Sequence, residues 1–119
     1  FEVDLLTATV NDLEFSNFYS VTATRNDYMH GIVAWFDVKF TQIHKPMIMT
    51  TTPYEQDTHW KQTIFYFEGA IKMQKGEKTN GSIAVKKNDE NPRHLDIKVS
   101  YRYKGRNHHF HRVHQYKYQ

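Results

Sequence analysis

Three adjacent residues, Thr58-His59-Trp60, are the strongest candidates for chemistry in this sequence. They stand just before residues 63–67, whose alternating pattern is typical of a β-strand. We therefore expect a loop that places both rings at the rim of a sheet. There an imidazole can pair with a carboxylate, and an indole can form the wall of a pocket. The alternative is that Trp60 covers the core and His59 is a solvated loop residue.

The C-terminal tail holds a second group of candidates, the histidines at 108, 109, 111 and 114. On a strand, His109 and His111 would share a face about 7 Å apart, which is close enough for two imidazoles to share a metal ion. A metal site needs three or four ligands, and neither a cysteine nor a nearby carboxylate supplies the others. We favour solvated histidines and expect no metal site.

The remaining residues offer no catalytic group. Paired carboxylates such as Asp12 with Glu14 lie in turn-like stretches, where capping and solvation explain them. The five glycines form no G-x-G pattern, so a nucleotide or phosphate cradle is not expected, and no nucleophile elbow is present. The absence of cysteine excludes disulfides and fits an intracellular protein. We expect no catalytic, cofactor-binding or metal-binding residue in this chain.

The elements that must position these residues are strands. Apolar residues alternate over 32–40 and over 95–103, and turn residues such as Asn80-Gly81 separate the runs. A first strand is expected near 1–10, and residues 67–75 are the one stretch expected to form a helical turn. The pattern predicts an all-β fold, an antiparallel β-barrel or sandwich of about six to eight strands, incomplete at its N-terminal edge.

At 119 residues, the chain is expected to form a single domain with one modest core. The expected core is listed here: Ile32, Phe36, Val38, Ile64, Tyr66, Ile83, Val85, Leu95, Ile97 and Val99. No apolar stretch approaches the roughly 20 residues needed to cross a bilayer, so we expect a soluble protein without a membrane partner. The start at Phe1, inside an alternating pattern, suggests a piece of a longer protein with an open sheet edge through which copies could associate.

A formal charge of +3, with basic residues between aromatic ones, leaves a second function class open. A stand-alone basic barrel could bind single-stranded nucleic acid by charge and stacking. However, alternation assigns Tyr101 and Tyr103 to the inward face, whereas stacking residues would have to face outward. A third class is a structural module that binds partners through its open edge.

Four stretches resemble the protein arginine N-methyltransferases, in the family's order and spacing. THWKQTIFYF (58–67) is similar to the family's Thr-His-Trp loop and the strand after it, and RNDYMHGIVAWFDVKFT (25–41) resembles the long strand upstream. NPRHLDIKVSYRYKG (91–105) resembles a strand near the family's C-terminus. FEVDLLTATVNDLEF (1–15) resembles the segment after the dimerisation arm. The resemblance is greatest to type I members, which make asymmetric dimethylarginine.

The resemblance implies that this chain is the C-terminal β-barrel, the substrate-binding domain that follows the dimerisation arm. The S-adenosylmethionine-binding domain and the arm have no counterpart here. The parent protein would transfer methyl from S-adenosyl-L-methionine to arginine ω-nitrogens, whereas the chain alone would be inactive and bind no cofactor. Family partners would be arginine-rich substrates, such as histone tails and Arg/Gly-rich RNA-binding proteins, and a second copy in a homodimer. The expected location is the nucleus and cytoplasm.

The resemblance also implies roles for five residues. His59 would bond a carboxylate of the catalytic domain, Trp60 would wall the substrate-arginine cleft, and Thr58 would fix the loop. The family uses its extreme C-terminus near the active site, which makes Tyr116 and Tyr118 further substrate-binding candidates. The sequence departs from the family at residues 54–57, before the loop, and at His94, where the family has Asp.

Overall fold

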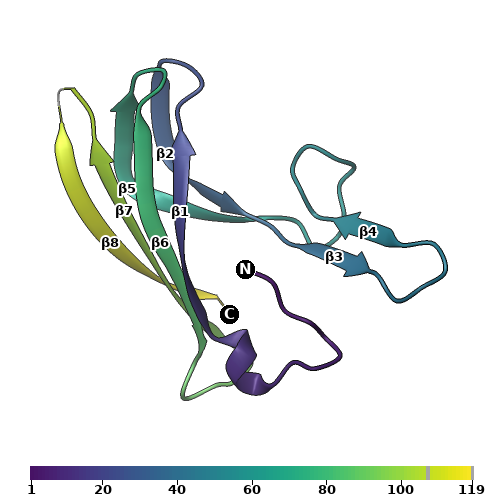
Figure 1. Ribbon diagram of the computed structural model, residues 1–119. Coiled ribbons are helices and arrows are strands. Elements are labelled where there is room, and N and C mark those ends of the chain that lie inside the picture. Colours follow the sequence, from purple (N-terminus) through teal and green to yellow (C-terminus); the bar gives the residue numbers. More distant parts are fainter. Residues whose placement is uncertain (107, 119) are drawn as a thin grey trace. The chain divides into compact units, whose positions relative to one another are not determined.

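The structure, a computed structural model, describes residues 1–106 and 108–118. They form a 3-10 helix (Val10–Leu13) and eight strands (Figure 1). The strands are β1 (Phe15–Thr22), β2 (Asp27–Ala34), β3 (Asp37–Phe40), β4 (Met47–Thr50), β5 (Thr63–Met73), β6 (Lys78–Lys87), β7 (Leu95–Lys104) and β8 (His109–Tyr118). No helix in this part of the chain is long and apolar enough to cross a membrane.

The chain divides into two compact units. We call Phe1–Met29 together with Ile71–Gln119 the sheet unit, and His30–Ala70 the hairpin unit. Strands β2 and β5 contribute residues to both. The candidate loop at 58–60 lies in the hairpin unit, whereas the C-terminal tyrosines lie in the sheet unit.

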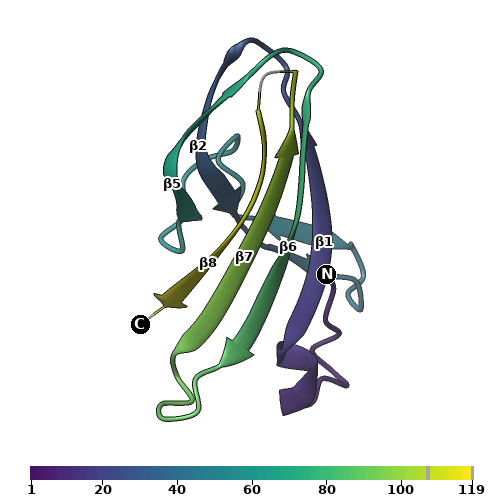
Figure 2. The ribbon, with the colours of Figure 1, turned by 90° about the vertical axis from the view of Figure 1, so that its left-hand side faces the viewer.

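The sheet unit is built on one four-stranded sheet in the order β1-β6-β7-β8 (Figure 2). All three neighbouring pairs are antiparallel, and the register places Tyr19 opposite Gly81 and Val99 opposite His114. Strands β6, β7 and β8 follow one another in the sequence, so short turns connect them. This arrangement is typical of antiparallel meanders.

Strand β7 alternates as the sequence predicts. Ile97, Val99, Tyr101 and Tyr103 are 7%, 1%, 3% and 2% exposed, while the side chains between them are mostly exposed and include Lys98 and Arg102. The prediction of one buried face and one wet face is confirmed for this strand. The inward position of Tyr101 and Tyr103 also removes them as stacking residues for nucleic acid.

Tyr19 packs over Gly81, its partner on the adjacent strand. The Tyr19 hydroxyl donates a hydrogen bond to the Ser100 carbonyl oxygen over 2.8 Å, and a Cβ on Gly81 would collide with the Tyr19 ring and with the Ser100 backbone. The glycine therefore makes room for the phenol, an aromatic-over-glycine arrangement that fixes strand register. Burial of this phenol raises the pKa of Tyr19.

Tyr103 joins β7 to the turn between β5 and β6. Its hydroxyl donates to the Lys72 carbonyl oxygen over 3.0 Å and to a Glu77 carboxylate oxygen over 2.6 Å. The same carboxylate accepts hydrogen bonds from the Gln74 and Arg106 amides. These bonds, first that from Gln74 and then that from Tyr103, lower the pKa of Glu77. Burial, and then the Glu77 carboxylate, raises the pKa of Tyr103 to about 12.

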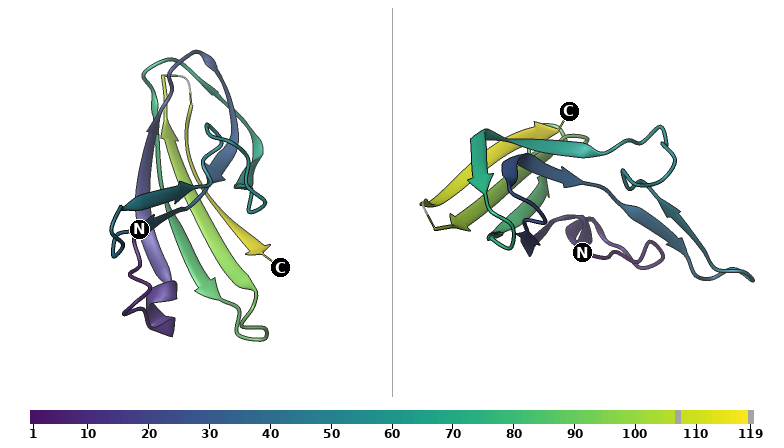
Figure 3. Two further views of the ribbon diagram at one scale, coloured as in Figure 1. Left: turned by 90° about the vertical axis from the view of Figure 1, so that its right-hand side faces the viewer. Right: turned by 90° about the horizontal axis from the view of Figure 1, so that it is seen from above.

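The hairpin unit contains the antiparallel pair β3–β4 and parts of the paired strands β2 and β5 (Figure 3). Gly31 in β2 lies so close to β5 that an added Cβ would meet the Phe65 carbonyl oxygen at 2.5 Å. In the β3–β4 pair, Asp37 lies opposite Thr50 and accepts a hydrogen bond from its hydroxyl.

Several local predictions are wrong. Residues 1–9 form no strand. In this segment the Leu6 amide donates a hydrogen bond to Asp4 and the Thr9 amide donates one to Asp12, and such bonds compete with sheet pairing. Residues 67–73 continue β5 instead of forming a helical turn, and the buried residues Phe67, Ile71 and Met73 share one face of the strand. The long run at 32–40 is broken between β2 and β3, at Trp35 and Phe36.

The predicted core is also wrong in part. Ile64 and Tyr66 are 47% and 66% exposed, while Phe65 and Phe67 are 4% and 8% exposed, so β5 buries the opposite face from the one predicted. Phe36 is 47% exposed. Ile97 and Val99 are buried as predicted, whereas the other expected core members are half-buried: Ile32, Val38, Ile83, Val85 and Leu95.

The fold class is confirmed as all-β and antiparallel, with a strand number in the predicted range. The strands of the described residues form three separate sheets, of four, two and two strands, and their hydrogen bonds do not close a barrel. The prediction of one domain stays a prediction.

Candidate functional site

The loop that carries His59 and Trp60 runs from 51 to 62, between β4 and β5 of the hairpin unit. Its position between two strands agrees with the predicted strand start at Thr63. The two rings lie against each other, with centroids 4.1 Å apart and planes at 33°. Trp60 is 50% exposed and His59 is exposed, so both rings present a face to solvent.

The indole of Trp60 contacts the ring of Phe36, which lies directly before β3. The Phe36 and Trp60 ring centroids are 6.3 Å apart with the planes at 71°, an edge-to-face contact that aromatic pairs favour. A second edge-to-face pair joins Trp35 to Tyr54 at 6.4 Å in the same unit. Tyr54, in the stretch where the sequence departs from the family pattern, thus contributes an aromatic contact within the loop.

The first end of the loop is anchored by Thr51, which is 2% exposed. Its amide and its hydroxyl both donate to the Phe36 carbonyl oxygen, over 3.1 and 2.8 Å. The same hydroxyl oxygen accepts a hydrogen bond from the Phe36 amide over 3.1 Å. Three hydrogen bonds therefore fix the main chain of the residue whose ring contacts Trp60.

The second end of the loop is anchored by Gln62, whose side-chain amide donates to the Thr51 carbonyl oxygen over 2.8 Å. Between the two anchors, the Lys61 amide donates to the Thr58 carbonyl oxygen over 3.3 Å and closes a turn. Lys61 has a φ of 57°, in the left-handed region that residues with a Cβ seldom adopt. The Thr58 hydroxyl oxygen is buried without a hydrogen-bond partner among the described residues.

The C-terminal candidates lie on β8, in the sheet unit. Tyr116 is half-buried opposite Ile97, and burial raises the pKa of its hydroxyl. Tyr118 is 54% exposed opposite Leu95. Because they belong to the other unit, their place at a substrate site stays a prediction.

The histidines divide into two kinds. His108, His109 and His111 are exposed, as favoured from the sequence. The expectation of a solvated side chain is wrong for His114. It is half-buried, and its Nε2 lies 3.0 Å from the Tyr101 hydroxyl, with the two rings stacked at 5.5 Å. No group of three or more metal-ligating side chains occurs among residues 1–106 and 108–118.

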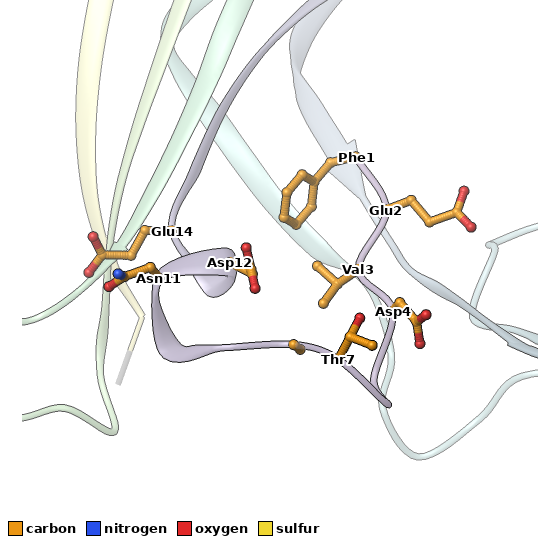
Figure 4. A pocket seen from close by; sticks show the side chains of 9 residues that line it. Phe1, Glu2, Val3, Asp4, Thr7, Asn11, Asp12 and Glu14 are labelled. Atoms are coloured by element: carbon orange, nitrogen blue, oxygen red, sulfur yellow. The ribbon is translucent and has the colours of Figure 1, made fainter.

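A hollow of about 330 Å³ lies at the N-terminal segment, lined by Phe1 to Asp4 and by residues before, within and after the 3-10 helix. Figure 4 shows Glu2 and Asp4 directed to one side of this segment, and Glu14 directed to the other. Asp12 accepts hydrogen bonds from the amide and hydroxyl of Thr9, which lower its pKa. The acidic side chains of this hollow therefore do not converge on one point.

A smaller hollow of about 260 Å³ lies at the turn between β6 and β7, and His94 is one of the residues that line it. The Asn88 side chain donates to both carboxylate oxygens of Asp96 over 3.1 Å, and the Asn91 amide lies 3.2 Å from the His94 Nε2. These contacts order the turn. His94 thus has a local partner in place of the charge that the family pattern would put there.

Comparison with known proteins decides the family. Residues 1–106 match the family described as the arginine methyltransferase oligomerization subdomain. The chain belongs to the arginine methyltransferase family. The confirmed resemblance covers the loop at 58–60, whereas β8 lies beyond the matched residues.

Two relatives show how much of an arginine methyltransferase the chain represents. Protein arginine N-methyltransferase 1 of Chlamydomonas reinhardtii is 46% identical over 103 residues, which cover 87% of this chain and 30% of the relative. Protein arginine N-methyltransferase 1 of Schizosaccharomyces pombe is 43% identical over 105 residues, which cover 88% of this chain and 31% of the relative. The chain therefore spans about a third of the length of these methyltransferases.

Two solved methyltransferase structures share the fold. The Trypanosoma brucei PRMT1 enzyme-prozyme heterotetrameric complex with AdoHcy has a TM-score of 0.92 at 30% identity, covering 98% of this chain and 37% of that chain. Protein arginine methyltransferase 10 of Arabidopsis thaliana has a TM-score of 0.80 at 25% identity, covering 97% and 35%. The comparisons give no support to the nucleic-acid alternative.

The residues that support the loop at 51–62 are not evident from the sequence pattern. The pattern predicts Phe36 to be in the core, and it indicates no role for Thr51 or Gln62. A threonine before a Thr-Pro turn and a glutamine before a strand are the only signals available, and both residue types are common at such places. The hydrogen bonds that join 36, 51 and 62 depend on the tertiary fold.

Proposed function

We propose that this chain is the substrate-side, C-terminal portion of a protein that transfers methyl groups from S-adenosyl-L-methionine to arginine ω-nitrogens. The exposed His59–Trp60 pair carries the proposal, because it stands on a fixed loop of a chain that belongs to the arginine methyltransferase family. The names of the relatives and the AdoHcy in the trypanosomal complex support this activity. AdoHcy is what the methyl donor becomes after it has lost its methyl group.

In this proposal, Trp60 forms one wall of the cleft for the substrate arginine. A guanidinium is planar and stacks favourably on an aromatic face, so an indole that keeps half its surface open can restrict its orientation. Methyl transfer breaks a carbon–sulfur bond while a carbon–nitrogen bond forms. The reacting atoms must therefore be held close together and in line.

His59 connects this loop to the rest of the protein. Its exposed ring rests on Trp60, and we assign it a hydrogen bond with a carboxylate of the catalytic domain. Such a bond would fix the ring and, through the contact at 4.1 Å, the indole. Thr58 holds the turn through its carbonyl oxygen.

We propose that S-adenosyl-L-methionine binds outside this chain. The hollow at the N-terminal segment has carboxylates that point in different directions, and the sequence offers no glycine-rich phosphate or nucleotide loop. We therefore assign donor binding and the chemical step to other parts of the protein. No residue of this chain is proposed as a catalytic residue.

The proposed substrates are arginine-rich proteins such as histone tails and Arg/Gly-rich RNA-binding proteins, with an asymmetric dimethyl product and a location in nucleus and cytoplasm. A homodimer is the proposed assembly, and the description of the family as an oligomerization subdomain supports it. Because this chain is basic, the acidic surface for such substrates must come mostly from elsewhere in the protein.

The test replaces the two rings in the complete protein. We expect Trp60→Ala to lower methyl transfer to an arginine peptide about 10- to 100-fold, because the guanidinium loses its wall. His59→Ala should lower it by a smaller factor. Transfer is measured with labelled S-adenosylmethionine, and Tyr54→Phe is the control.

The thermal stability of both variants should stay close to that of the parent, since both side chains are exposed. The 119-residue chain by itself should transfer no methyl group. Full activity of Trp60→Ala would contradict the proposed role of the indole, and activity of the isolated chain would contradict the assignment of chemistry to the rest of the protein.

A further inference from the structure

The loop that presents His59 and Trp60 is tied together at its base. Gln62, at the end of the loop, donates its side-chain amide to the carbonyl oxygen of Thr51, at the start, over 2.8 Å. The loop of residues 51 to 62 is thereby closed by one side chain. Loops of this length without such ties fluctuate, because their ends are joined only through the flanking strands.

Thr51 extends the tie to Phe36. With 2% of its surface exposed, it makes three hydrogen bonds to the Phe36 main chain, at 2.8, 3.1 and 3.1 Å. Hydrogen bonds in such a buried setting are strong, and breaking one leaves a buried polar group unpaired. The position of the Phe36 backbone is therefore well determined.

Phe36 in turn sets the indole, since its ring meets Trp60 edge to face at 6.3 Å. A continuous series of contacts thus runs from Gln62 through Thr51 and Phe36 to Trp60, and then to His59. The left-handed conformation of Lys61, between Trp60 and Gln62, agrees with this arrangement. A residue keeps such a conformation when the surrounding contacts over-determine it.

We propose that Gln62 and Thr51 are positioning residues, forming a hydrogen-bonded clamp that holds the Trp60 wall in the orientation needed for methyl transfer to arginine. The inference rests on the proposed function. Neither residue is assigned a contact with substrate. The clamp acts through the Phe36 backbone and ring.

The experiment compares matched variants of the complete protein. Gln62→Met keeps the length of the side chain and removes its donor, and Thr51→Val keeps the shape and removes the hydroxyl. Gln56→Met is the control, because Gln56 is an exposed glutamine of the same loop. Gln62 is only half-buried, so Gln62→Met is expected to fold even if Thr51→Val does not.

The first readout follows the indole itself. The protein is labelled with 5-fluorotryptophan, and the fluorine line of Trp60 is identified as the line that Trp60→Phe removes. Gln62→Met should shift or broaden this line. The control, Gln56→Met, should leave it unchanged.

The second readout is kinetic. Gln62→Met should lower kcat/KM for an arginine peptide about tenfold, while the KM for S-adenosylmethionine and the melting temperature stay the same. A merely structural role would lower the melting temperature without this selective loss. The inference is overturned if Gln62→Met leaves either the Trp60 line or the transfer rate unchanged.

This failure can be distinguished from failure of the proposed function. Absence of methyl transfer from the unsubstituted complete protein would overturn the proposed function. Full methyl transfer by Trp60→Ala would overturn the proposed role of the indole, and the clamp's role in catalysis with it. Loss of transfer in Trp60→Ala together with normal transfer in Gln62→Met would overturn the clamp alone.

Discussion

Lys61 is the one described residue other than glycine with a positive φ, and it directly follows the exposed indole. The left-handed conformation costs a residue with a Cβ about 1–2 kcal/mol. Strain of this kind is found where a loop is held in one conformation for a purpose. The conformation of Lys61 therefore indicates that this loop is strained and lowers the stability of the fold.

Lys61→Gly should stabilise the 119-residue chain by about 0.5–1 kcal/mol. Glycine relieves the left-handed strain, although part of the gain is offset by its greater freedom in the unfolded chain. Urea unfolding measures the change. Lys61→Ala is the control, since alanine keeps the strain, and equal stability of the two variants would contradict the interpretation.

The ionisation of Glu77 makes the stability of the fold depend on pH. Its pKa lies below the ordinary value of 4.5 because the Gln74 amide and the Tyr103 hydroxyl stabilise the carboxylate. A lowered folded-state pKa means that the unfolded chain binds the proton more tightly. The contribution of Glu77 to stability is therefore present above about pH 4.5 and is lost as the pH falls through the folded-state pKa.

Tyr103→Phe should move the pKa of Glu77 upward, but not fully to the ordinary value, since the amide hydrogen bonds remain. The difference in unfolding free energy between pH 7 and pH 3 should shrink accordingly. A carbon-detected NMR titration of the Glu77 carboxyl measures the pKa. Tyr54→Phe, which changes a phenol in the other unit, should leave it as it was, and an unmoved Glu77 in Tyr103→Phe would refute the account.

At the scale of elements, the sequence predicts β7 well and β5 poorly for the same physical reason. In β7, charged or polar side chains separate the apolar ones, so only one face can be buried. In β5, Ile64, Phe65, Tyr66 and Phe67 are all apolar or aromatic, and both faces qualify. Which face is buried then depends on tertiary packing, which a period of two does not contain.

A matched pair of isoleucines tests this difference. Ile97→Ala, on the buried face of β7, should lower the free energy of unfolding by about 2–5 kcal/mol through lost burial and a cavity. Ile64→Ala, at 47% exposure on β5, should lower it by clearly less. Denaturant unfolding of both variants measures the two changes in unfolding free energy. Equal decreases would mean that Ile64 belongs to the core.

The location of the candidate site was predictable from the sequence, but the residues that anchor its loop were not. Polar residues 58–62 followed by an alternating strand are enough to place His59 and Trp60 on a loop before β5. The family resemblance adds their proposed roles. The anchors Thr51 and Gln62 act through main-chain atoms of residues 36 and 51, and main-chain partners leave no trace in a sequence.

At the scale of the whole molecule, the outer strands of the four-stranded sheet bear on association. Strands β1 and β8 are its terminal strands, and Phe18 on β1 is 89% exposed. An exposed aromatic residue on a terminal strand is a common starting point for pairing between copies. The open edge expected from the sequence thus has a specific candidate in β1.

Phe18→Lys should weaken self-association of the 119-residue chain at least about tenfold, because a charge at an edge strand opposes pairing. Light scattering over a range of concentrations provides the measurement. Gln74→Lys adds the same charge at another exposed position and should have little effect. If both variants associate like the parent chain, β1 is not the contact.

The histidine-bearing strand β8 has a practical consequence. The family match ends at residue 106, yet β8 pairs along its whole length with β7, from His109 opposite Lys104 to Tyr118 opposite Leu95. A protein engineer who trimmed the gene at the end of the match would delete a quarter of the sheet and uncover the strand that holds Val99. Peptides appended for purification or imaging belong after the last of these paired residues.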